Sequence, residues 1–178
     1  MGMWAARVDE GYVFGELTPS AVQTLRGVPM LLESKDERVR ARLLPETYDE
    51  HDDEEHWREH AVPELERLFL SRTTLVQRDL DKLRKLPDSE NYVLLVIDEH
   101  VNAWLAALNA ARLALYVLND LTAEHMETEG FSGADQKQQE AIIRISLLAE
   151  FQAVLLGEFP VDEGDGSFDD LVDDLVDE

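Results

Sequence analysis

The chain has 178 residues, with 39 acidic against 16 basic residues, a net charge of −23 and no cysteine. This length fits one domain that buries roughly 70% of its unfolded surface, so no disulfide or metal ion is needed to hold a core. The charge repels the phosphates of nucleic acids and of anionic membranes, which excludes both classes of partner from our expectations.

The first residues lack the basic start and the apolar stretch of a secretion signal. Charged residues interrupt the apolar stretches well short of the ~18 residues that a membrane span needs. We therefore expect a cytoplasmic protein.

The chain opens with a predicted β-hairpin. Segments 4–8 and 12–17 are rich in β-forming residues, and they flank the short turn Asp9-Glu10-Gly11. Thr18 and Pro19 then predict the start of a helix, as its N-cap and first helical residue.

Gly27 and Pro29 are expected to interrupt this first helix, because proline removes a helical hydrogen bond. A short helix is predicted over residues 35–44. The acidic stretch that follows leads into another helix, which Asp52 or Asp53 would cap and which runs to His60.

A long helix is predicted from Pro63 to about Leu86. Residues 91–97 then predict a third strand, since they include β-branched residues and are too few for a confident helix. Segments 12–18 and 92–98, which are 80 positions apart, each predict a strand followed by a helix cap. We expect the two strands to be neighbours in one small sheet.

The central helix of the core is predicted over residues 98–119, with Asp98 as its cap. Arg112 is the only full charge between Val101 and Leu118. The apolar residues follow the spacing of one helix face. They are Val101, Trp104, Leu105, Leu108, Leu115 and Tyr116.

A last long helix is predicted from about Ala134 to Gly157, capped near Ser132 or Gly133. Together these elements predict an α+β fold that is mainly α, with about five helices packed on a small three-stranded antiparallel sheet. We expect residues 1–158 to form one globular domain and residues 159–178 to form an acidic C-terminal tail.

Segments 102–109 and 112–115, behind a strand and an acidic cap, resemble the bacterial family DUF2017. Segment 40–48 is similar to that family's other recognisable part. The initial hairpin and Leu148 to Phe151 occur in the same order, so the resemblance covers about residues 3–158.

The family has no known function and offers no catalytic residue to carry over. Its genes often lie beside the gene for the adaptor of the Clp protease, so the resemblance implies a link to protein turnover. The sequence departs from the family pattern at Ala110, usually acidic, and at Tyr116, usually glycine. It also lacks the tryptophan that is common near Arg144.

Arg112 is the first candidate site, because an unpaired cation on an apolar stripe costs several kcal/mol. We expect it to pair with Glu150, the only acid between Ala141 and Leu156. The alternative is an arginine that binds an anion in a pocket between helices. Asn109, one turn away, would help in either case.

The second candidate is the pattern H-x-x-E-H at His56, Glu59 and His60. On a helix the two histidines lie one turn apart and can share a zinc ion, with Glu59 as general base. The alternative is an exposed acidic helix whose histidines are merely polar. His51 could add a ligand for weaker, adventitious metal binding.

The third candidate is the tail, in which Gly164 and Gly166 form a hinge. Its apolar residues make one stripe on an acidic helix, a common form of helix-in-groove recognition. The stripe consists of Phe168, Leu171, Val172, Leu175 and Val176. The alternatives are a solubilising tail and a helix folded back on its own domain.

From these observations we expect a non-enzymatic interaction or regulatory protein without a cofactor. Its partner would be another protein or a second copy of this chain. The competing class is a metal-dependent hydrolase using the H-x-x-E-H residues.

Overall fold

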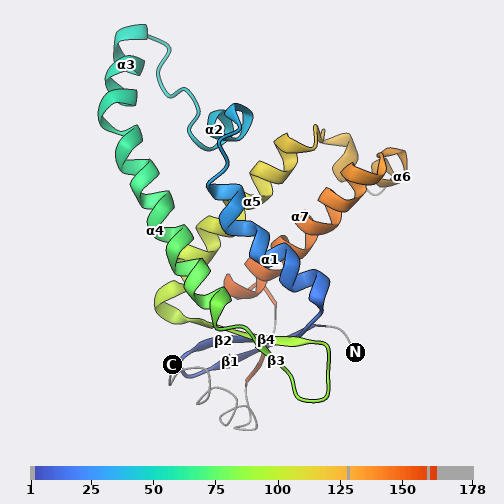
Figure 1. Cartoon of the computed structure of the whole chain (residues 1–178). Helices are drawn as coiled ribbons and strands as arrows, with labels where there is room; N and C mark the ends of the chain where they lie inside the picture. The colour runs from blue at the N-terminus through green and yellow to red at the C-terminus, as the bar shows by residue number, and fades with distance from the viewer. Residues whose placement is uncertain (1–2, 128, 160, 164–178) are drawn as a thin grey trace.

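The computed structural model describes residues 3–127, 129–159 and 161–163. In these residues a small sheet forms one layer, and the long helices pack over one of its faces (Figure 1). The fold is α+β and mainly helical, as the sequence predicts. It contains more elements than the predicted five helices and three strands, because several short helices and two short strands join them.

Strands β1 (Trp4–Val8) and β2 (Gly11–Leu17) form the predicted hairpin. Strand β4 (Tyr92–Ile97) pairs antiparallel with the other edge of β2, with Phe14 opposite Leu94. The two segments related by the offset of 80 positions are therefore neighbours in one sheet, as expected.

Two strands of two residues each were not predicted. β3 (Arg84–Lys85) pairs antiparallel with β4, and β5 (Asp162–Glu163) pairs parallel with β1. The strand order is β3-β4-β2-β1-β5.

Alternate residues of β2 face opposite sides of the sheet. Phe14 faces the helices and stacks on Phe151 of the last helix, with ring centroids 4.4 Å apart. Val13 faces the other side, where it packs with Val93 in a second, smaller apolar cluster. The main core thus lies between the sheet and the helical layer.

Helix α1 (Pro19–Leu32) begins as predicted, with the Thr18 hydroxyl accepting a hydrogen bond from the N–H of Ala21. The prediction that Gly27 and Pro29 interrupt it is wrong, because the helix continues through both residues. Pro29 is buried, so packing against the core offsets the helical hydrogen bond that proline cannot make.

Helix α5 (Val101–Leu118) is the central helix of the core, and the short 3₁₀ turn Asp98–His100 precedes it. By length and composition the segment Asp98–Leu118 could cross a membrane. In this structure, however, four helices of the same chain pack against it, which is the arrangement of a core helix.

Asp98 does not cap α5. Both of its carboxylate oxygens accept hydrogen bonds from Arg7 of β1, at 2.8 and 2.7 Å. This pairing raises the pKa of the Arg7 guanidinium above its ordinary value. The acid that follows β4 therefore links the strands of the sheet, and the 3₁₀ turn makes the transition into the helix.

Three helices lie between α1 and the third strand of the sequence analysis. α2 (Glu37–Leu43) is short, α3 (His51–His60) has no buried residue, and α4 (Val62–Asp81) packs against α1 and α5. α4 ends before the predicted Leu86, because the following residues pair with β4 as strand β3.

The last long helix, α7 (Gln136–Leu155), is capped by Asp135 rather than by Ser132 or Gly133. Asp135 and Gln138 form a reciprocal capping box, which satisfies two N–H groups at once. The short elements Glu124–Met126 and Gly130–Gly133 fill the connection before it.

Candidate functional site

An apolar groove with a volume of about 500 Å³ lies between α1, the end of α5 and the middle of α7. These three helices are joined side by side through the core (Figure 1). The groove is lined by Gln23, Thr24, Arg26, Gly27, Met30, Leu31, Ser34, Leu115, Leu118 and Arg144.

Two features of α1 keep this groove open and apolar. Gly27 has no side chain, and a Cβ atom built there would meet no other atom within 4 Å. Met30, one turn away, is 75% exposed although methionine is an apolar side chain that adapts its shape readily. Methionine is a common residue at surfaces that bind varied partners.

Arg26 of α1 and Arg144 of α7 line the groove, and both are exposed. Neither has an ion pair or a hydrogen bond with any residue that the structure describes. The described residues that line the groove include no acidic residue. On a chain with a net charge of −23, the charged residues of this described lining are therefore both basic.

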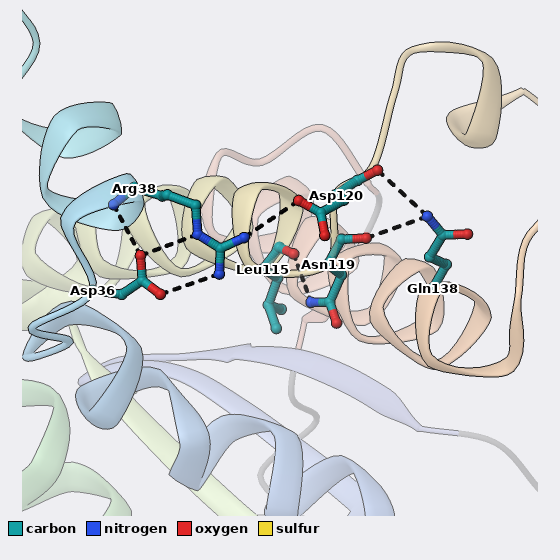
Figure 2. Close-up of polar contacts among 6 residues, drawn as sticks. All are labelled: Asp36, Arg38, Leu115, Asn119, Asp120 and Gln138. Carbon is teal, nitrogen blue, oxygen red and sulfur yellow. Dashed lines mark hydrogen bonds and ion pairs between the residues drawn. The ribbon is translucent and has the colours of Figure 1, made fainter.

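A network at the end of α5 holds the helices that form the groove. The Arg38 guanidinium donates to Asp36 at the start of α2 and to Asp120 just after α5 (Figure 2). The hydrogen bonds from Arg38 lower the pKa of Asp36 below its ordinary value. Arg38 therefore ties α2 to the end of the central helix.

The same network reaches α7. The Gln138 amide donates to the main-chain carbonyls of Asn119 and Asp120, at 3.3 and 3.4 Å (Figure 2). The Asn119 amide donates in turn to the carbonyl of Leu115, a lining residue of the groove, at 2.7 Å. These contacts fix the end of α5 relative to α7, and so fix the apolar wall of the groove.

A second hollow of about 470 Å³ lies between the end of α1, α2 and α4. Its lining charges are balanced, with Glu33 and Glu66 against Lys35 and Arg40. Arg40 already forms an ion pair with Glu66 across it. This hollow therefore offers no net charge with which to select a charged partner.

Arg112 is partly buried between α5 and α7, but its partner is not the predicted Glu150. Its Nη1 donates to the side-chain oxygen of Gln152 at 2.5 Å, and the Gln152 amide donates to the carbonyl of Leu105. Glu150 is exposed and forms no ion pair with Arg112. A neutral amide thus takes the place expected for a carboxylate.

The acidic surroundings of Arg112 do not favour the binding of an anion. The shallow hollow that Arg112 lines also contains Glu150 and Glu158, which repel an anion. One donor of Arg112, the buried Nε, has no hydrogen-bond partner among the described residues. Asn109, expected to assist Arg112, is exposed on α5.

His56 and His60 lie one turn apart on α3, with ring centroids 4.4 Å apart, as the H-x-x-E-H pattern predicts. The Nε2 of His60 lies 3.7 Å from a carboxylate oxygen of Glu59. In the part of the chain that the structure describes, no group of three His, Asp or Glu side chains is arranged to hold a metal ion. The pattern lies on a helix that buries no residue.

The acidic stretch before this pattern has a structural role. Glu54 accepts hydrogen bonds from the N–H groups of Tyr48 and Thr47, both at 2.8 Å. It also pairs with Arg58 one turn later. The two backbone hydrogen bonds lower the pKa of Glu54, and they fasten the preceding loop to α3.

Sequence reasoning missed a buried polar cluster between α4 and α5. Asp79 is only 6% exposed, and it contacts the side chains of His100 and Trp104. The signal was present, because Asp79 lies on the apolar side of α4 beside Leu80. A buried indole N–H also needs an acceptor.

The predicted stripe of the tail lies outside the described residues. It consists of Phe168, Leu171, Val172, Leu175 and Val176.

Residues 5–158 match the model of a family described as a domain of unknown function, DUF2017. No curated protein and no solved structure gives a significant match.

Proposed function

The chain belongs to the DUF2017 family, and we propose that it is a non-enzymatic interaction protein whose α1–α5–α7 groove binds an acidic, amphipathic segment of a protein partner. The observation that carries this proposal is the pair Arg26 and Arg144, which lack described ionic partners and flank an apolar groove on an acidic chain. Charged rims around apolar centres are the common anatomy of protein interfaces.

The chemistry of the groove favours a helical or extended apolar segment rather than a small polar ligand. Met30, Leu31 and Leu118 provide apolar surface whose burial contributes about 25 cal/mol for each Å² removed from water. The two arginines select the charge of the partner and speed its encounter. The net charge of −23 on the chain repels acidic segments elsewhere on its surface.

The metal-dependent hydrolase is the weaker proposal. His56, Glu59 and His60 lie on an exposed helix without a third ligand among the described residues. A catalytic zinc site needs three protein ligands and an enclosed open position. The groove, in contrast, combines shape, apolar surface and charge in one place.

The family resemblance also supports a role in protein turnover beside the adaptor of the Clp protease, and we propose it as the cellular setting. The test is the rate at which a Clp substrate is degraded with and without this protein. Under the proposal, adding this protein changes the rate at which the substrate is degraded. Adding the Arg26→Glu/Arg144→Glu variant leaves that rate unchanged.

The binding proposal is tested with two synthetic helical peptides that share one apolar stripe and differ only in carrying acids or lysines on the other face. Fluorescence anisotropy with the full chain should show binding of the acidic peptide alone. Arg26→Glu/Arg144→Glu should abolish it, and raising the salt from about 0.1 M to about 1 M should weaken it.

A matched control replaces Arg42 and Arg78, which are exposed, lie outside the groove and have no described ion pair. Arg42→Glu/Arg78→Glu makes the same change in net charge and should bind the acidic peptide like the parent. Equal binding of both peptides, or equal loss in both double variants, would refute a charge-selective groove.

A further inference from the structure

We propose that the groove of one copy receives residues 164–178 of a second copy of this chain, so that the protein associates through its own acidic tail. This inference rests on the proposed function, because it names the occupant of the same groove. The structure describes the chain as far as residue 163, and residues 164–178 of the sequence follow it.

The tail has the chemistry that the groove selects. Residues 164–178 contain seven acidic residues and no basic residue. Phe168, Leu171 and Leu175 begin the i, i+3, i+7 spacing that places apolar side chains on one face of a helix. An acidic helix with one apolar face complements an apolar groove flanked by Arg26 and Arg144.

The sheet register places the last described residue near the end of β1 that lies away from the start of α1. β5 runs parallel to β1, with Glu163 opposite Arg7, so the direction of this strand is toward Val8. Arg7 lies opposite Tyr12 of β2. The strand β2 runs on from there to Leu17, about 17 Å further at ~3.4 Å per residue, before α1 begins.

The stretch of chain between the groove and the sheet along α7 is about as long as the stretch along β2. Arg144 precedes the end of α7 at Leu155 by eleven residues, about 16 Å of helix axis. The chain then continues from Leu155 to the sheet, where residue 162 pairs with β1.

Only residues 164–167 connect β5 to the first residue of the stripe, Phe168, and four extended residues span at most ~14 Å. This linker is shorter than either stretch of chain, which favours the groove of a second copy over the groove of the same chain. The groove of a second copy has no such restriction.

Each copy presents one groove and one tail, so two copies can exchange tails reciprocally. Such an arrangement closes on itself as a two-fold dimer with two identical contacts. The second contact forms within an assembly that the first has already made, which strengthens the whole beyond one tail in one groove.

The first experiment measures the oligomeric state of the full chain by sedimentation velocity over a range of concentrations. The parent should form dimers at low salt that dissociate as the salt rises from about 0.1 M to about 1 M. Arg26→Glu/Arg144→Glu should weaken the association by roughly tenfold or more, and so should Leu171→Asp/Leu175→Asp in the tail. Arg42→Glu/Arg78→Glu should behave like the parent.

The second experiment mixes the groove variant with the tail variant. The groove variant keeps an intact tail, and the tail variant keeps an intact groove. The mixture should therefore form a heterodimer with one tail–groove contact, although neither variant dimerises alone. A mixture that shows no association at any concentration overturns the proposal, and so does a parent that is monomeric at all concentrations. The salt response of the unmodified parent tests the same claim if a variant fails to fold.

The outcomes also separate this inference from the proposed function. If the acidic test peptide binds the groove while the parent stays monomeric, the groove is an interaction site but its occupant is not a second copy. If neither the peptide nor a second copy binds, both proposals fail. If the parent dimerises and the groove variant dimerises equally well, a different surface is responsible and this inference is wrong.

Discussion

Asp79 of α4 accepts a hydrogen bond from the indole Nε1 of Trp104 of α5, at a distance of 2.7 Å. Trp104 is fully buried. The second carboxylate oxygen of Asp79, Oδ1, lies 2.9 Å from Nδ1 of His100. One carboxylate thus joins the helix that precedes β4 to the helix that follows it.

Replacing Asp79 with alanine should lower the free energy of unfolding by about 1–3 kcal/mol, because it leaves the buried N–H of Trp104 without an acceptor. Asp79→Asn should cost less, since its amide oxygen can still accept from the indole. Urea denaturation measures both. Asp81→Ala, two residues away and exposed, is the control and should lie within about 0.5 kcal/mol of the parent.

A second prediction separates the two possible partners of Arg112. Gln152→Ala should destabilise the fold by about 0.5–2 kcal/mol, because it removes the acceptor of a partly buried guanidinium. Glu150→Gln should change the stability by less than about 0.5 kcal/mol, since Glu150 is exposed. Thermal melting of the two variants compares them directly, and a larger loss for Glu150→Gln would contradict the observed pairing.

A third prediction concerns the pH dependence of the loop before α3. Hydrogen bonds from Tyr48 and Thr47 lower the pKa of Glu54, so the loop contact is fully present above the ordinary glutamate pKa of about 4.5. The contact is lost as the pH falls through the lower pKa of the folded state. The amide proton signals of Thr47 and Tyr48 should therefore shift in that acidic range when followed by NMR.

Glu54→Gln supplies the control for this titration. The neutral amide keeps an acceptor for the two N–H groups but has no proton to gain in acid. The two amide signals should then stay constant over the same pH range. An unchanged titration in Glu54→Gln would assign the shift to another acid.

A fourth prediction compares two glycines with opposite surroundings. A Cβ at Gly11 would lie 2.1 Å from the carbonyl oxygen of Val96, within the β2–β4 pairing, so Gly11→Ala should cost about 1–3 kcal/mol. A Cβ at Gly27 meets nothing, and alanine is favoured over glycine within a helix. Gly27→Ala should therefore stabilise the protein by about 0.5–1 kcal/mol in denaturant unfolding.

Elements whose signals are local could be predicted from the sequence. The hairpin, the third strand and the central helix follow from periodicity, and the similarity of segments 12–18 and 92–98 correctly placed β2 beside β4. The end of α4 could not be predicted in this way. Arg84 and Lys85 leave the helical pattern because they pair with a strand that comes later in the chain.

The partner of Arg112 shows why charge alone did not identify a contact. Glu150 and Gln152 are two positions apart on α7, so they point in nearly opposite directions, about 200° apart around the helix. Which of them meets α5 depends on how α7 is rotated in the core, and Phe151 sets that rotation by stacking on Phe14.

The groove has no local signal at all. Its two arginines and Leu118 come from three helices and are separated by up to 118 positions in the sequence. No periodicity links such residues. Only the packing of α1, α5 and α7 brings them together, which is why sequence reasoning did not find the groove.

The pairing of β2 with β4 also has a consequence for the newly made chain. Leu17 ends β2, and Ile97 ends β4 eighty residues later. At about 5–20 residues per second, the ribosome takes roughly 4–16 s to supply the missing strand. During that interval the finished hairpin exposes one open edge of β2, so nascent chains translated on the same messenger can meet edge to edge before their own sheets are complete.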